Sequence, residues 1–124
     1  MNGTEDDVAE ENTDIQVTDR GDYVVLQPVT DLDVYKVGSL RDAIGRMIED
    51  GTPRVVVALD AVPFMDSSGL GALMGGVRRL RETGGDLAIA CTREQHLKLF
   101  SITGFGEGVS IAPTVEEAAE GFNT

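Results

Sequence analysis

The sequence predicts one α/β domain in which a mixed sheet of about five strands is covered by about four helices. Three observations support this fold class. The 124 residues fit one domain, and a composition of 41% hydrophobic and 26% charged residues is that of a globular protein. Short apolar runs also alternate along the chain with segments of helical periodicity. No repeat of fixed period is visible, which excludes solenoid folds.

The chain begins with a strongly acidic segment. Residues 1–14 contain six acidic residues, no basic residue and, after Met1, a single large aliphatic residue. Such a segment cannot offset its ordering entropy by burying apolar surface, so we expect a disordered acidic tail at 1–14 and a folded domain at 15–124. The acidic residues are Glu5, Asp6, Asp7, Glu10, Glu11 and Asp14.

The first elements are predicted to be a hairpin and a helix. Apolar and polar residues alternate at 15–17, residues 20–22 have the composition of a turn, and 23–26 form an apolar run. A helix should start near Val37 and end before Gly51. Its apolar positions have the spacing of one buried helical face: Leu40, Ala43, Ile44, Met47 and Ile48.

Two buried strands with a helix between them come next. Residues 55–59 form a continuous apolar run rich in β-branched residues, which is typical of a central strand covered on both faces. Residues 87–90 give the next buried strand. The helix between them should end at Gly84 and Gly85, and its buried face is marked by Leu70, Leu73, Met74, Val77 and Leu80.

Two capping-box patterns predict the remaining helices. Thr92 with Gln95 should open the third helix, and Thr114 with Glu117 should open the fourth. In each pair a side-chain oxygen accepts a hydrogen bond from a free backbone N–H. The end of the third helix and a last short strand are expected between them, at Gly104 and at Val109 and Ile111.

Charge and residue types argue against several functions. The 22 acidic and 10 basic residues give a charge of −12, which repels phosphate backbones, so no direct nucleic-acid binding is expected. No apolar stretch reaches the roughly 20 residues of a membrane span and no signal sequence is visible, so we expect a cytoplasmic protein without membrane contact. Cys91 and His96 are the only residues of their types. No disulfide, metal or cofactor is therefore expected.

The most informative segment, 62–71, lies between the central strand and the second helix. Asp66 or Ser67 can cap the helix N-terminus, where the helix dipole also favours a phosphate group. On spacing alone, a plain helix cap and a phosphate-accepting site both remain open.

Four glycines occupy the predicted second helix, where each costs about 1 kcal/mol relative to Ala. For Gly69 and Gly71, close approach of a partner protein is the favoured explanation. For Gly75 and Gly76, approach of a partner protein and close packing of the helix on the sheet both remain open.

The sequence resembles the bacterial anti-sigma factor antagonists, which are single STAS domains. The resemblance rests on Phe64-Met65-Asp66-Ser67-Ser68-Gly69-Leu70-Gly71, which matches the family signature of an apolar pair followed by Asp, Ser, Ser or Thr, Gly, Leu and Gly. Supporting matches extend it over nearly all of residues 15–122. They are Asp31-Leu32-Asp33-Val34-Tyr35, Arg78-Arg79-Leu80, Leu99-Phe100-Ser101-Ile102-Thr103-Gly104 and Thr114-Val115-Glu116-Glu117-Ala118.

The resemblance implies a regulatory switch and no enzyme activity. In the family, the first serine of the signature is phosphorylated by an anti-sigma factor that is a serine kinase, and this places the acceptor at Ser67. The unphosphorylated antagonist binds that kinase and frees a sigma factor for transcription, and a metal-dependent serine phosphatase restores it. Asp33 matches an acidic residue of the kinase interface. The expected partner-binding residues of a protein that is monomeric when free are Asp33, Tyr35, Asp66, Ser67, Ser68, Gly69 and Leu70.

Two other functions share single features of this sequence. A response-regulator receiver, phosphorylated on aspartate, also has β-α alternation, and Asp31 and Asp33 could imitate its magnesium-binding pair. However, Pro63 follows Asp60 too closely for the receiver motif. A hydrolase with Ser67 as nucleophile would need His96 as its base, and no G-x-S-x-G elbow surrounds the serine.

Two further features each leave two explanations open. Tyr35 is either an interface aromatic or a hydrophobic staple for the first helix. The arginines at 78, 79 and 81 either complement the helix C-terminus, which is favoured, or attract an acidic partner. Cys91 is expected to be an inert core residue, and His96 a surface or structural residue.

Overall fold

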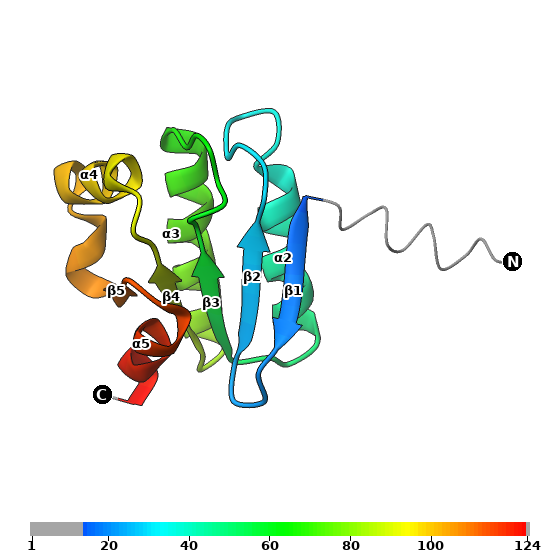
Figure 1. Cartoon of the computed structure of the whole chain (residues 1–124). Helices are drawn as coiled ribbons and strands as arrows, with labels where there is room; N and C mark the ends of the chain where they lie inside the picture. Colours follow the sequence, from blue (N-terminus) through cyan, green and yellow to red (C-terminus); the bar gives the residue numbers. More distant parts are fainter. Residues whose placement is uncertain (1–13, 124) are drawn as a thin grey trace, which may run out of the picture.

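The computed structural model describes residues 14–123 and contains a five-stranded mixed sheet in the order β1-β2-β3-β4-β5 (Figure 1). The first two strands pair antiparallel as a hairpin, and every later neighbour pairs parallel. The fold class predicted from the sequence is therefore confirmed. The strands are β1 (Ile15–Asp19), β2 (Val24–Pro28), β3 (Arg54–Ala58), β4 (Asp86–Ala90) and β5 (Ile111–Ala112).

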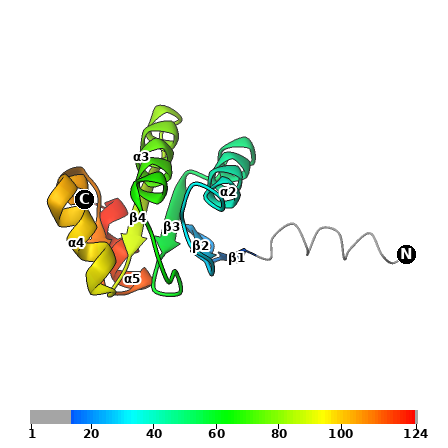
Figure 2. The same cartoon turned by 90° about the horizontal axis from the view of Figure 1, so that it is seen from above.

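The helices cover both faces of the sheet. In Figure 2, α2 and α3 lie on one side of the sheet and the short α5 lies on the other. The helices are α2 (Gly38–Glu49), α3 (Ser67–Glu82), α4 (Glu94–Thr103) and α5 (Val115–Glu120), with 3₁₀ turns η1 (Phe105–Gly108) and η2 (Gly121–Asn123).

The two-sided core follows from the alternation of side chains along each strand. In β3, Val55 and Val57 face the α2 and α3 side, whereas Val56 belongs to the smaller cluster on the α5 side. All three valines are fully buried, as predicted for a central strand. The predicted stripe of α2 is also confirmed, because Leu40, Ala43 and Ile44 are buried.

The strand order separates this fold from a receiver domain. A receiver has the doubly wound order 2-1-3-4-5, whereas the strands here follow one another in sequence and begin with an antiparallel hairpin. Asp60, the acidic residue nearest the end of β3, accepts hydrogen bonds from the Thr92 N–H (2.6 Å) and the Thr92 hydroxyl (2.7 Å). The receiver alternative is therefore wrong.

The same contacts correct the predicted capping box at Thr92. The N-cap of α4 is Arg93, one residue after Thr92, and it makes no side-chain cap hydrogen bond. The Thr92 hydroxyl instead donates its proton to Asp60. The cap of α5 is confirmed, since the Glu117 N–H donates to the Thr114 hydroxyl at 3.1 Å.

The chain after α4 also differs in part from the prediction. Gly104 ends α4 as expected, in the left-handed region at φ 74°. The next residues form the 3₁₀ turn η1, which the sequence pattern did not indicate, and Val109 lies outside β5. The last strand is therefore two residues long.

The lone cysteine and histidine are both core residues. Burial raises the pKa of the Cys91 thiol, which keeps it protonated and unreactive at neutral pH. His96 is 2% exposed, and its Nε2 lies 2.8 Å from the carbonyl oxygen of Val62. Within residues 14–123, no helix is long and apolar enough to cross a membrane.

Candidate functional site

The candidate site lies at the carboxyl-terminal edge of the parallel strands, where two loops run side by side (Figure 1). The loop after β2 pairs with the loop before α3 through a parallel bridge between Leu32 and Met65. The Leu32 N–H donates to the Phe64 carbonyl at 2.9 Å, and the Asp66 N–H donates to the Leu32 carbonyl at 3.4 Å. This pairing brings Asp33 and Ser67, which are distant in sequence, onto one edge.

Asp66 fixes the start of α3. Its backbone is extended (φ −119°, ψ −163°), and its Oδ1 accepts the Ser68 N–H at 2.8 Å, as expected of an N-cap. Ser67 is consequently the first helical residue, and its side chain is exposed. Ser68 is only partly exposed. Of the two alternatives open from the sequence, Asp66 is the cap and Ser67 is left available.

Asp33 organises the turn that leads into α2. Its Oδ1 accepts the N–H groups of Tyr35 and Lys36, both at 3.0 Å, and its carbonyl accepts the Val37 N–H at 2.9 Å. Such an Asx-type turn holds the backbone without help from the core. Asp33 therefore has a local structural role in addition to the interface role that the family resemblance implies.

Exposed apolar side chains lie on both loops of the site. Tyr35 is 90% exposed, Val34 66% and Phe64 53%. A staple residue would be packed against its helix, so the staple alternative for Tyr35 is wrong. Sequence reasoning missed Val34 and Phe64 as candidate contacts. The signal for Phe64 was its place in the signature, two residues before Asp66.

Gly69 and Leu70 pack inside the domain, which corrects their assignment as partner contacts. A Cβ at Gly69 would lie 2.6 Å from Met65 Cγ and 2.8 Å from both the Cβ and the carbonyl oxygen of Leu32. The close approach that requires a glycine is therefore made by the neighbouring loop. Leu70 is buried in the main core.

The other glycines of α3 differ in the space that surrounds them. A Cβ at Gly76 would meet Ile44 Cδ1 at 2.8 Å and Leu87 Cδ1 at 3.1 Å, so this glycine allows close packing of α3 on α2 and β4. A Cβ at Gly71 or Gly75 would meet nothing within 4 Å. Approach of a partner at Gly71 stays a prediction.

A hydrolase would use His96 as the base that activates Ser67. A carbonyl oxygen can only accept, so His96 Nε2 must carry its proton in the bond to Val62, and that nitrogen cannot serve as a general base. Within residues 14–123, no group of three or more His, Cys, Asp or Glu side chains is arranged to hold a metal ion. The geometry provides an exposed hydroxyl at a helix N-terminus, framed by apolar side chains.

This sheet order and this helix start define the class of protein. The chain belongs to the STAS domain family, which it matches over residues 14–118. It is 33% identical over 93 residues to the anti-sigma-B factor antagonist of Staphylococcus aureus, an alignment that covers 75% of this chain and 86% of the relative. The corresponding protein of Staphylococcus epidermidis is 34% identical over the same length.

Solved structures show the same fold. The anti-sigma factor antagonist SpoIIAA in its unphosphorylated form has a TM-score of 0.72 at 27% identity, covering 86% of this chain and 93% of that chain. The phosphorylated form of SpoIIAA, from Bacillus, has a TM-score of 0.66 at 28% identity, over 86% of this chain and 96% of that chain. An anti-sigma factor antagonist from Mycobacterium paratuberculosis has a TM-score of 0.80 at 24% identity, covering 89% of this chain and 93% of that chain.

Proposed function

We propose that this chain is an anti-sigma factor antagonist that acts in the cytoplasm as a phosphorylation switch. In its unphosphorylated form it binds an anti-sigma factor serine kinase and thereby frees a sigma factor for transcription. Phosphorylation of Ser67 by that kinase ends the binding, and a serine phosphatase restores it. The names of the curated relatives support the antagonist role.

The observation that supports the switch most directly is the position of Ser67. Its hydroxyl is exposed, whereas Ser68 is partly covered and its N–H is bound to Asp66. A phosphoryl group on Ser67 would lie at the helix N-terminus, where free amides and the helix dipole favour an anion. The domain can therefore carry the phosphate without unfolding. The likeness to a phosphorylated form of SpoIIAA also supports this.

The surrounding side chains fit a protein-binding surface. Exposed Tyr35, Val34 and Phe64 supply apolar area on the two paired loops that lead into α2 and α3. Aromatic residues are enriched among the residues that contribute most to binding energy. Asp33 adds a negative charge, which would complement a basic residue on the partner. None of this surface requires a metal or cofactor.

The test is a paired capture from the protein's own cells. Ser67→Ala is the bait that cannot be switched off, and Ser67→Asp is its negatively charged control. We expect the first bait to retain a protein kinase that the second does not retain, and the purified kinase with ATP to phosphorylate wild-type protein on Ser67. A bait pair that retains the same proteins equally would contradict the proposal.

Asp33 should contribute to kinase binding through its negative charge. It should contribute to stability through Oδ1, which accepts the two hydrogen bonds of the turn. Asp33→Asn keeps the Oδ1 acceptor of the turn, so we expect Tm to stay within a few degrees while binding to the kinase weakens. Asp33→Ala removes both turn hydrogen bonds and should lower the free energy of unfolding by about 1 kcal/mol. Thermal melts and titration calorimetry separate the two effects. If Asp33→Asn bound normally per folded molecule, the charge would have no role in recognition.

The predicted acidic tail lies outside the described residues except for Asp14. The Asp14 carbonyl accepts the Val29 N–H at 2.9 Å, and its carboxylate accepts the Ser39 hydroxyl at 3.2 Å. We propose that residues 1–13 are dispensable, so a protein starting at Asp14 should have nearly the wild-type Tm and kinase affinity. A protein starting at Gln16 is the control, because it also loses the buried Ile15 and should melt earlier. A tenfold loss of affinity on removing 1–13 would assign the tail to the interface.

A further inference from the structure

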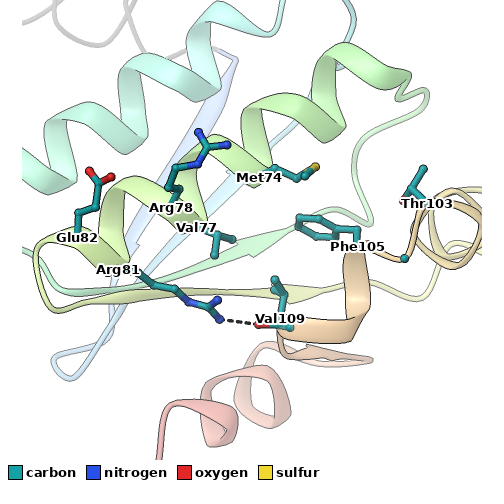
Figure 3. A pocket seen from close by; sticks show the side chains of 10 residues that line it. Met74, Val77, Arg78, Arg81, Glu82, Thr103, Phe105 and Val109 are labelled. Atoms are coloured by element: carbon teal, nitrogen blue, oxygen red, sulfur yellow. Dashed lines mark hydrogen bonds between the residues drawn. The ribbon is translucent and has the colours of Figure 1, made fainter.

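A second candidate site lies at the opposite end of α3 from Ser67. An open groove of about 580 Å³ runs between the carboxyl-terminal half of α3 and residues 103–109 (Figure 3). Clefts that hold small molecules have volumes of about 300 to 1,000 Å³ and mostly apolar walls with few polar groups. The groove therefore has the size and character of a ligand site.

The walls of the groove are apolar and firmly held. Val77, Phe105 and Val109 point toward one another across it (Figure 3). Phe105 is buried and its ring packs on Phe100, with centroids 5.1 Å apart. The helical period predicts Met74 on the buried face of α3, and this is wrong, because Met74 is 46% exposed and leaves part of its side chain open to solvent beside the groove.

The turn after α4 leaves the groove open. The left-handed backbone at Gly104 ends the helix and directs the chain into η1. Gly108, at the end of that turn, has no side chain to fill the space, and a Cβ there would meet nothing within 4 Å. The opening is therefore a consequence of the backbone path and does not depend on one side-chain rotamer.

Two arginines of α3 border the groove of this acidic protein, and the Arg78 guanidinium points away from Phe105 and Val109 in Figure 3. Arg81 is held in place, because its Nε donates to Asp86 at 2.9 Å and its Nη2 donates to the Gly108 carbonyl. Its Nη1 and the whole guanidinium of Arg78 have no acceptor among residues 14–123. Glu82 supplies the one carboxylate among the lining residues. The groove thus combines apolar walls with unused cationic donors.

We propose that this groove binds a small amphipathic anion, an apolar chain that ends in a carboxylate. The chain would lie against Val77, Phe105 and Val109. The carboxylate would accept hydrogen bonds from the free Nη1 of Arg81 and from Arg78, once the exposed Arg78 side chain has turned toward the groove. Charge-assisted pairing of this kind distinguishes an anionic ligand from a neutral or cationic ligand of equal length. The proposal does not depend on the function proposed for Ser67.

Decanoate below its micellar concentration is the probe, titrated into the ¹⁵N-labelled full chain. We expect amide shift changes at Val77, Gly104, Phe105 and Gly108, and binding at least about tenfold tighter than that of decyltrimethylammonium. Arg78→Gln should weaken decanoate binding about fivefold or more. Arg79→Gln is the matched control, because it removes the same charge from the same helix. The Arg79 guanidinium lies on the α2 side, 3.2 Å from where a Cβ of Gly45 would be, so its loss should change affinity less than about twofold.

Several results would overturn the proposal. Equal affinity for the anion and the cation, or equal effects of Arg78→Gln and Arg79→Gln, would show non-specific apolar association. Shift changes confined to the Tyr35 and Phe64 surface would place the ligand elsewhere. Sedimentation of the free protein as a dimer that Met74→Glu dissociates would assign the groove to a second copy of the chain. Glu82→Gln should strengthen decanoate binding about twofold, because it removes a like charge, and weaker binding would also count against the proposal.

Discussion

Phosphorylation of Ser67 is expected to weaken binding to the kinase by at least about 30-fold while leaving the domain folded. The phosphoryl group adds a charge of about −1.5 to −2 to a surface that the complex would bury, next to the carboxylate of Asp66. Burying a charge without a partner costs about 2 kcal/mol or more, and each 1.4 kcal/mol is a factor of ten in affinity. In the free domain, solvent and the first-turn amides of α3 accommodate the same charge.

Matched variants at Ser67 and Ser68 identify which serine accepts the phosphoryl group. Ser67→Ala should bind within about threefold of wild type, since a hydroxyl at an exposed position contributes little, and Ser67→Asp should bind about tenfold or more weakly. Ser68→Ala should still be phosphorylated on Ser67. Peptide mass spectrometry after incubation with kinase and ATP identifies the residue, and calorimetry gives the affinities. Phosphate found only on Ser68, or a Ser67→Asp protein that binds as tightly as wild type, would refute the assignment.

Gly69→Ala is expected to lower the free energy of unfolding by about 1 to 3 kcal/mol and Tm by roughly 5 to 15 °C. The added methyl group would lie 2.8 Å from the backbone oxygen of Leu32, and backbone cannot move aside as a flexible side chain can. Relief of the clash would separate the two loops that are joined at Leu32 and Met65, so kinase binding should fall as well. Thermal and urea unfolding with far-UV detection measure the first effect.

Gly71→Ala is the matched control, two residues further along the same helix. Nothing lies within 4 Å of a Cβ at that position. Alanine favours the helix over glycine, so stability should rise by about 0.5 to 1 kcal/mol. Any loss of kinase binding by Gly71→Ala would then be a contact effect and would support partner approach at this glycine. Equal stability of the Gly69→Ala and Gly71→Ala proteins would contradict the packing role of Gly69.

The sequence by itself determined the features that depend on near neighbours along the chain. Strand β3, the buried stripe of α2, the Thr114 cap and the left-handed end of α4 at Gly104 all occur where the pattern placed them. Each follows from side-chain period or from a hydrogen bond within a few residues. The signature serine at the start of α3 belongs to this group as well, because the cap at Asp66 is a local contact.

Only the tertiary structure decided features whose partners are distant in sequence. Thr92 has a capping-box neighbour at Gln95, yet its hydroxyl is bound to Asp60, 32 residues earlier. Gly69 is explained by Leu32, which the loop pairing brings against α3. The groove beside α3 likewise depends on where η1 packs. The local sequence pattern limits the structural roles that a residue can take. Which of these roles it takes depends on the atoms that the fold brings within about 3 Å, because a hydrogen bond or a steric clash acts only at that range.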